Sequence, residues 1–352
     1  MSFAPLPVLV DTIVIGAGQA GLAAAYYLRQ HGVDFRVLDA GPAVGASWAG
    51  RYDSLRLFSP AWVSGLPGLP WPGARLRYPT KDEAAAYLQQ YAAHFQFPIE
   101  LNQRVSYLGA APAGGYLLQT ATGQAYQTRR VIIATGPYTV PAVPGFAGHL
   151  PSVVQQLHSQ QYQRPGQLPG TGPVAVVGSG NSALQIAADL AATGRPVFVV
   201  FDEKTPAVPN NQLTWAALLG LGLLRIPRHT RLGQFMYRQP EPIVSGDLAR
   251  LRGFANAHFI GRVSAALPDG ALQGRLEATP RLQAVVWATG FRPDYAWLHL
   301  PILAPDGSPR HHRGLTDAPG VAFLGLSWLD SRRSALLNGA GPDARRVVKA
   351  LL

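Results

Sequence analysis

Short apolar runs alternate with glycine-rich turns and helix-like stretches along this chain. The first run, Thr12–Ile15, leads straight into the turn GAGQAG at residues 16–21, after which apolar positions recur at helical spacing. This order predicts a strand, a tight turn and a helix. A second apolar run at 35–38 predicts a strand that ends at Asp39, 18 positions beyond Gly21.

The spacing within this turn indicates chemistry as well as structure. In such a turn, Gly16 permits the sharp bend, Gly18 lets a pyrophosphate approach the backbone, and Gly21 lets the helix pack against the strand. The free N–H groups at the helix N-terminus favour phosphate. Asp39 would accept hydrogen bonds from an adenosine ribose. Residues 16–39 therefore predict a dinucleotide-binding site.

A second turn of the same kind occurs half-way along the chain. The sequence GSGNSA at 178–183 follows an apolar run at 174–177 and precedes a helix-like stretch and another apolar run. Alanine is an accepted variant in the third glycine position. The ribose end is ambiguous, because Asp202 favours a free 2′-hydroxyl whereas Lys204 would meet a 2′-phosphate. The second site thus leaves NADH and NADPH open.

Both turns are followed, at similar distances, by a strand that ends in Ala-Thr-Gly. These strands lie at 131–136 and 285–290. Such self-similarity indicates an internal repeat of one domain type. The sequence therefore predicts an α/β fold with two Rossmann-like three-layer domains, the second inserted in the first. The expected first domain comprises residues 1–145 and 286–352, and the second comprises 146–285.

The composition of the chain excludes several classes of function. The 352 residues suffice for about two domains, and 47% of them are apolar. With no cysteine, the chain has no disulfide, thiolate nucleophile or cysteine-ligated metal, which excludes a disulfide reductase. No spacing typical of a metal site occurs. The net charge of +11 suggests nucleic acid, but the only lysines are Lys81, Lys204 and Lys349 and the arginines are scattered, so we expect no nucleic-acid partner.

The longest apolar stretch, Leu213–Leu224, is shorter than the roughly 20 residues that span a bilayer. Basic residues follow it, so a helix lying on a membrane surface stays open beside the favoured interpretation, a buried or lid helix. The N-terminal sequence MSFAPLPVLV lacks the positive start of a signal peptide. We therefore expect no transmembrane segment and a cytoplasmic protein, and we leave a homodimer open.

Six segments carry a family resemblance over essentially the whole chain. They are GAGQAGLAAAYYL, WAGRYDSLRLFSP from Trp48, YPTKDEAAAYLQQYA from Tyr78, VVGSGNSALQIA, ATGFRPDYAWL and FLGLSWLDSRRSALLNGAG from Phe323. Together they resemble the flavin-containing monooxygenase superfamily, and within it small bacterial flavoproteins labelled as involved in potassium transport. The resemblance implies FAD in the first domain and NADPH or NADH in the second. It also implies a flavin C4a-hydroperoxide, with O2 and a small molecule as substrates.

The segment that identifies this superfamily, F-x-G-x-x-x-H-x-x-x-[Y/F/W], corresponds to residues 152–162. His158 and Tyr162 match, whereas Ser152 and Val154 replace the phenylalanine and glycine. Baeyer–Villiger enzymes carry Trp-Pro at the place of Tyr162, so the resemblance favours oxygenation of nitrogen or sulfur centres. Two alternatives stay open: an NAD(P)H oxidase or electron-transfer flavoprotein, and a nucleotide-sensing regulatory partner of an ion transporter.

The predicted site consists of cofactor contacts, and no catalytic side chain is assigned. His158 is interpreted as a positioning or packing residue. Trp48 and Arg51 are expected to bring an aromatic face and a cation to the cofactor, with a buried packing role for Trp48 left open. By the resemblance, a helix start near Ser334 faces the flavin. The expected FAD contacts are Gly16, Gly18, Gln19, Ala20, Gly21, Asp39, Ala40, Ser47, Trp48, Arg51, Val105, Ala134, Thr135, Gly136, Ser334, Ala335 and Leu336. The expected nicotinamide-dinucleotide contacts are Gly178, Ser179, Gly180, Asn181, Ser182, Lys204, Thr289 and Gly290.

Overall fold

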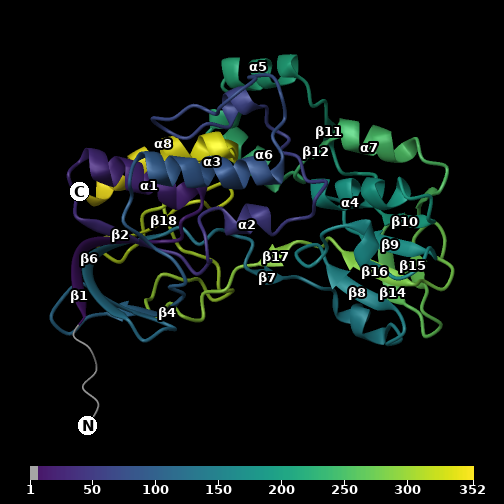
Figure 1. Ribbon diagram of the computed structural model, residues 1–352, viewed down its shortest axis with the longest axis horizontal. Helices are drawn as coiled ribbons and strands as arrows, with labels where there is room; N and C mark the ends of the chain where they lie inside the picture. The colour runs from purple at the N-terminus through teal and green to yellow at the C-terminus, as the bar shows by residue number, and fades with distance from the viewer. Residues whose placement is uncertain (1–6) are drawn as a thin grey trace, which may run out of the picture.

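Figure 1 shows the computed structural model, which describes residues 7–352. The chain forms two layered α/β units that lie side by side, one built around each glycine-rich turn. The expected fold class, with two Rossmann-like units, is confirmed. The interpretation of the N-terminal ten residues falls mostly on residues outside the described range.

The first unit is built on a seven-stranded sheet in which β1, β2, β3, β6 and β18 run parallel and β4 and β5 run antiparallel to their neighbours. Helices α1, α3 and α8 lie together over one face of this sheet (Figure 1). The helices are α1 (Gln19–Gln30), the short α2 (Ala46–Ala49), α3 (Lys81–His94) and α8 (Leu337–Leu351). Across the sheet, the strands are β3 (Ile99–Glu100), β2 (Phe35–Leu38), β1 (Val8–Ile15), β6 (Ala125–Ile133), β5 (Tyr116–Thr120) and β4 (Val105–Ala110), with β18 (Val321–Phe323) also paired to β6.

The second unit is built on a sheet of five parallel strands. Val174 and Val176 enter a hydrophobic cluster with residues of α4 and α7, whereas Ala175 and Val177 enter a separate cluster on the opposite face. Both faces are therefore buried, which explains why these strands are continuous apolar runs. The elements are β13 (Ala257–Phe259), β10 (Val197–Val200), β9 (Val174–Val177), β16 (Ala284–Trp287), β8 (Gln155–His158), α4 (Asn181–Ala191), α7 (Ser245–Arg252) and the hairpin β14 (Val263–Ala266) and β15 (Leu272–Gly274).

The chain crosses between the units twice, and the two crossings pair with each other. Strand β7 (Val140–Pro141) runs antiparallel to β17 (Phe291–Arg292). The expected boundary at residue 286 falls inside β16, which pairs along its whole length with β8 and β9 of the second sheet. The chain therefore leaves the second sheet only after Trp287.

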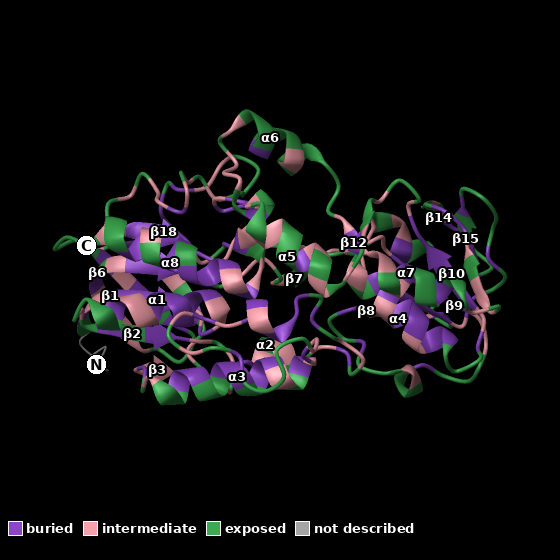
Figure 2. Ribbon diagram, turned by 90° about the horizontal axis from the view of Figure 1, so that it is seen from above, coloured by how far each residue is buried: buried purple, intermediate pink, exposed green. Residues whose placement is uncertain are grey.

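One segment of the second unit extends over the first unit, and we call residues 209–242 the arm. The arm leaves after β11 (Ala207–Val208) and returns at β12 (Ile243–Val244), and these two strands pair in parallel. It contains α5 (Gln212–Gly220), the single turn η4 (Leu223–Arg225) and α6 (Arg231–Arg238). Figures 1 and 2 show α5 and α6 standing clear of both sheets.

The underside of the arm packs on the first unit. Trp215 and Leu224 are buried in a small cluster that includes Val63 and Leu336. Trp62 Nε1 donates a hydrogen bond to Gln212 Oε1 at 2.8 Å. The interpretation of 213–224 as a buried or lid helix therefore holds for one side of α5 only, because Leu213 and Leu221 are exposed. Within residues 7–352, no helix is both long and apolar enough to cross a membrane.

Candidate dinucleotide-binding site between the two units

The three glycines of the first turn have three different surroundings. Gly16 has φ +108°, and a Cβ placed on it would lie 2.5 Å from the carbonyl oxygen of Ala134. A Cβ on Gly21 would lie 1.8 Å from the carbonyl oxygen of Gly16, so α1 contacts the turn directly. A Cβ on Gly18 would meet no protein atom within 4 Å. Open space therefore adjoins the backbone at the position where the sequence predicts a pyrophosphate.

Asp39 holds this turn in place from the end of β2. Its Oδ2 accepts a hydrogen bond from Ala17 N at 2.6 Å, and its Oδ1 accepts one from Gly41 N at 2.7 Å. The carboxylate thus links the glycine-rich turn to the next loop. Each carboxylate oxygen has a second lone pair for a ribose hydroxyl.

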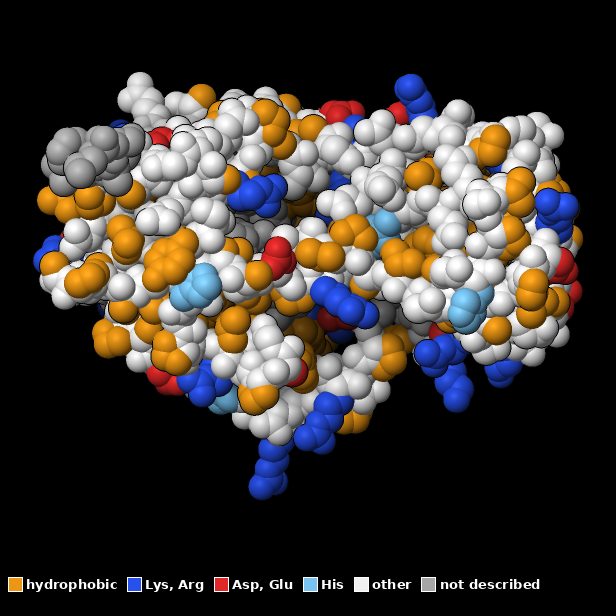
Figure 3. All heavy atoms as spheres, turned by 90° about the horizontal axis from the view of Figure 1, so that it is seen from below, with side chains coloured by type: hydrophobic (Ala, Val, Ile, Leu, Met, Phe, Trp, Pro, Cys, Tyr) orange, Lys and Arg blue, Asp and Glu red, His pale blue; other side chains and the backbone are white. Residues whose placement is uncertain are grey.

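A cavity of about 850 Å³ begins at this turn and extends between the two units. Figure 3 shows the surface hollowed between the two halves of the molecule. Most of the predicted cofactor contacts line this cavity: Gly16, Gly18, Gln19, Ala20, Asp39, Ala40, Ser47, Trp48, Arg51, Val105, Ala134, Thr135, Gly136, Asn181, Ser182, Ser334, Ala335 and Leu336. The predicted contacts that do not line it are Gly21, Gly178, Ser179, Gly180, Lys204, Thr289 and Gly290.

Trp48, within α2, and Arg51, just after α2, lie on the cavity wall. Trp48 Nε1 donates a hydrogen bond to Gln19 Oε1 at 3.3 Å, which joins the start of α1 to α2. The Arg51 guanidinium carbon lies 5.1 Å from the Phe291 ring centre and 5.6 Å from that of Tyr138. Burial lowers the pKa of Arg51. Within residues 7–352, no carboxylate lies at ion-pair distance from this guanidinium, so an anionic ligand would supply its partner.

The C-terminal segment of the chain forms one wall of the cavity at the N-terminus of α8. Ser334 lies at the end of a 3₁₀ turn, and its Oγ accepts hydrogen bonds from Asp330 N and Ser331 N, both at 3.2 Å. Leu336 is the N-cap and Leu337 the first residue of α8. Both residues line the cavity. The positive end of a helix dipole thus faces the space where the sequence predicts the flavin ring.

The second turn repeats the local geometry of the first. Gly178 has φ +149°, and a Cβ on it would lie 2.3 Å from the carbonyl oxygen of Ala288, whereas a Cβ on Gly180 would meet nothing within 4 Å. Ser179 Oγ accepts a hydrogen bond from Asp202 N at 2.8 Å, which sets the end of β10 against the turn. Lys204 is exposed. Asn181 Oδ1 accepts from Val244 N at 2.8 Å, so the turn also anchors the return of the arm.

Thr289 and Gly290 lie at the crossings. Ala142 N donates to Gly290 O at 3.0 Å, and Thr289 Oγ1 donates to Ala142 O. His158 Nε2 lies 2.9 Å from Gly290 O, and its Nδ1 accepts from Gln160 N at 3.2 Å. Because Nδ1 accepts, Nε2 carries the proton and donates to Gly290. His158 is therefore buried and hydrogen-bonded at the crossing, and it does not line the cavity.

The burial of His158 predicts a pH dependence of stability. Burial lowers the pKa of this imidazole in the folded protein, whereas the unfolded chain titrates near about 6.5. Below that pH the unfolded state binds a proton that the folded state does not bind. The free energy of unfolding therefore falls as the pH is lowered, by up to about 1.4 kcal/mol per pH unit. Denaturant unfolding of His158→Gln should show a shallower fall. An identical fall in the variant would contradict this assignment.

Several residues that line the cavity were not predicted from the sequence. Tyr52 OH donates to Gln185 Oε1 at 2.9 Å, and Gln185 Nε2 donates to Asp247 Oδ2 at 3.0 Å, which forms a polar chain between the units. Gln185 follows Asn181 by one helical turn, and this spacing could have indicated that both side chains lie on the same face of α4. Gly325 lies two residues beyond the end of the strand β18, and a Cβ on it would lie 2.7 Å from Ala20 Cβ. A glycine shortly after a strand could have indicated this close approach to α1.

Known proteins share this arrangement. The pattern of the pyridine nucleotide-disulphide oxidoreductases matches residues 13–215. The chain belongs to this family. It is 38% identical to the uncharacterized oxidoreductase CzcO-like of Geobacillus kaustophilus over 98% of this chain and 99% of that protein. It is 34% identical to indole-3-pyruvate monooxygenase YUCCA1 of Oryza sativa subsp. japonica over 53% of this chain and 47% of that protein. The flavin-containing monooxygenase from Stenotrophomonas maltophilia superposes with a TM-score of 0.79, at 30% identity, over 98% of both chains.

Membership in the family confirms the main expectations. The protein is an oxidoreductase of the flavin monooxygenase-like type, which uses FAD together with a nicotinamide dinucleotide. The disulphide chemistry in the family name requires thiols, and this chain has no cysteine.

Proposed function

We propose that the protein is an NAD(P)H-dependent flavin monooxygenase that oxygenates nitrogen or sulfur centres of small molecules. The observation that carries the proposal is the single cavity lined from both units. Such a cavity brings one dinucleotide against the other while excluding bulk water. The likeness over nearly all of both chains to the Stenotrophomonas maltophilia flavin-containing monooxygenase supports the same reaction class.

The residues of the first unit fit FAD. The open space at Gly18 accepts a pyrophosphate, Asp39 accepts ribose hydroxyls, and the N-terminus of α8 at Leu337 stabilises negative charge on the reduced ring. We therefore assign FAD to the unit made of residues 1–145 and the C-terminal segment, with the second boundary moved to follow Trp287. The nicotinamide dinucleotide is assigned to the segment between them, with the pyrophosphate at Gly180.

When bound, reduced flavin supplies the activation of O2 and the transfer of one oxygen atom. The chain orients and shields this chemistry. Trp48, anchored by Gln19, forms part of the wall, and Arg51 offers a cation to bound phosphate. The underside of the arm covers Leu336 at the cavity edge. A cytoplasmic location and a homodimer stay predictions.

The test of this function follows the fate of oxygen. The purified flavoprotein is reduced anaerobically with NADH or NADPH and then mixed with labelled O2 and a panel of thioethers and amines. Incorporation of label into a product supports the proposal. Return of the flavin to its oxidised state with one hydrogen peroxide per nicotinamide oxidised, across the whole panel, would establish the oxidase alternative. Tight nucleotide binding with negligible turnover would favour the regulatory one.

Selectivity between NADH and NADPH depends on the end of β10. Asp202 is held beside the second turn through Ser179, so we expect its carboxylate to accept the ribose hydroxyls and to repel a 2′-phosphate. Asp202→Ser should raise the KM for NADH about tenfold, a loss of about 1.4 kcal/mol, and should lower the KM for NADPH. Lys204→Glu is the companion variant, and equal effects on both cofactors would make Lys204 a surface residue. A selective loss of NADPH use in Lys204→Glu would contradict the assignment to Asp202.

A further inference from the structure

The outer side of the arm is an apolar surface without a partner. Leu213 is 82% exposed, Leu221 74% and Phe235 61%, and Leu223, Leu232 and Tyr237 are also exposed. Helix α5 contains no charged residue, and its opposite side is already seated on the first unit through Trp215. The exposed side therefore cannot be buried by closing α5 onto its own chain. Six large apolar side chains exposed within one projecting segment of 34 residues exceed ordinary scattered exposure.

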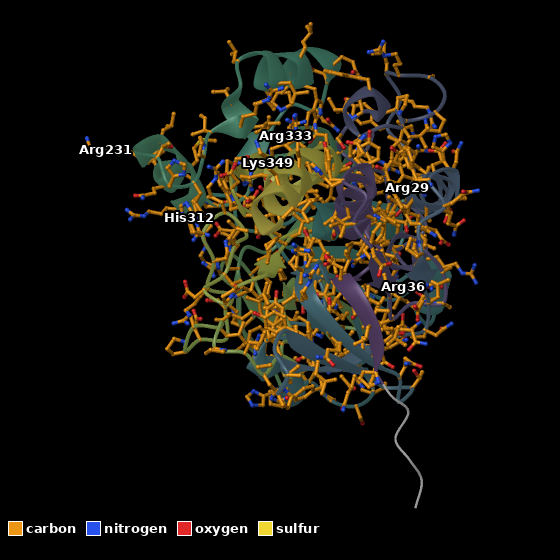
Figure 4. The ribbon with its side chains drawn as sticks, turned by 90° about the vertical axis from the view of Figure 1, so that its left-hand side faces the viewer. Arg29, Arg36, Arg231, His312, Arg333 and Lys349 are labelled. Carbon is orange, nitrogen blue, oxygen red and sulfur yellow. The ribbon has the colours of Figure 1, made fainter. Side chains whose placement is uncertain are left out.

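The same segment is strongly basic. Between Glu203 and Glu241 the sequence has no acidic residue, and the arm carries Arg225, Arg228, Arg231 and Arg238. Within residues 7–352, none of these four arginines forms an ion pair. Figure 4 shows Arg231 projecting from α6 away from the body of the molecule. Exposed leucine and phenylalanine bordered by arginine are typical of segments that lie in a bilayer interface.

We propose that the arm docks the enzyme on an anionic lipid surface, with α5 and α6 lying in the headgroup region. Acidic headgroups provide negative charge opposite the four arginines, and the acyl boundary accommodates the exposed leucines and Phe235. A second copy of the chain is a poorer partner. In a symmetric dimer through this surface, the four arginines of each arm would face those of the other, and Glu241, the one acidic residue of each arm, is already paired with Arg332 of its own chain.

Docking through the arm would place one wall of the cavity close to the membrane. The underside of the arm packs against Leu336, which lines the cavity. Small apolar amines or thioethers dissolved in the bilayer would then be concentrated near the cavity. This inference concerns location, so it neither requires nor tests the oxygenation reaction.

The test measures binding of the flavin-loaded protein to vesicles by flotation. Phosphatidylcholine vesicles are compared with vesicles that also contain phosphatidylglycerol, at low and high salt. The protein should bind the anionic vesicles, bind the zwitterionic ones weakly, and dissociate as salt screens the arginines. The doubly substituted Arg231→Gln, Arg238→Gln protein should bind about 25-fold more weakly, a factor of about five for each arginine. The Leu213→Ser, Leu221→Ser protein should lose about tenfold or more.

Matched controls lie elsewhere on the surface. Val153 is 64% exposed and precedes β8, in the lower part of the second unit in Figure 1, where α5 lies at the top. Val153→Ser and Arg281→Gln should each leave vesicle binding within about twofold of the wild type. Flavin content and the unfolding midpoint of every variant show whether it is folded. Absence of binding to anionic vesicles would overturn the proposal, as would equal losses in arm and control variants. A wild-type dimer that the leucine variant converts to a monomer would make the arm a self-association surface instead.

Discussion

Valine at Gly18 should abolish FAD retention while leaving a folded protein, whereas valine at Gly21 should prevent stable folding. Gly18 has φ −73° and ψ −177°, which valine adopts readily, and its Cβ would meet no protein atom. The added methyl groups would occupy the space of the pyrophosphate and weaken FAD binding by at least about a hundredfold. At Gly21 a Cβ would lie 1.8 Å from the carbonyl oxygen of Gly16, so the helix must move at a cost of more than about 4 kcal/mol.

Flavin absorbance after purification and denaturant unfolding of the flavin-free proteins separate the two effects. Gly180→Val is the matched control for Gly18→Val, because its Cβ also meets no protein atom. It should keep FAD and raise the KM for the nicotinamide cofactor. Recovery of Gly18→Val with a full complement of FAD would mean that the pyrophosphate lies elsewhere.

Replacing Arg51 by methionine should weaken cofactor binding and leave the stability of the cofactor-free protein equal or higher. The guanidinium lies against the Phe291 and Tyr138 rings, which also contact each other, and burial lowers its pKa, so the charge destabilises the cofactor-free protein. A bound phosphate compensates for that cost. Removing a buried cation from such a contact costs about 2 kcal/mol or more, so the KM for the nicotinamide cofactor should rise about 30-fold.

Lysine at position 51 separates charge from shape. It keeps the cation but lacks the planar group that stacks on aromatic rings, so its KM should lie between those of the wild type and the methionine variant. FAD content, measured in parallel, shows whether the flavin shares the contact. If Arg51→Met leaves both the KM and the FAD content unchanged while lowering stability, Arg51 serves only to pack the crossing.

Residues of the first turn were predictable because their signal is local. A strand, three glycines in register and an acid at a fixed distance occur within 28 residues, from Thr12 to Asp39. The Tyr52–Gln185 hydrogen bond was not predictable, because it joins residues 133 positions apart. Seven of the predicted cofactor contacts do not line the cavity, among them Thr289 and Gly290. They were predicted from the glycine-rich turn motif or from the family resemblance. At the crossings, those two residues hydrogen-bond to the backbone of the other crossing strand.

The sequence by itself determined the class of fold and the classes of chemistry. Two glycine-rich turns and two sets of apolar strands predict two dinucleotide-binding units, and the lack of cysteine excludes thiol chemistry. The tertiary structure alone decided three things: which glycine of a turn adjoins open space, that Arg51 has no carboxylate partner among residues 7–352, and that α5 buries Trp215 while exposing Leu213. Each of these depends on which distant segments pack together. Local periodicity shows that a residue belongs on a packed face, but only long-range contacts show what, if anything, covers it.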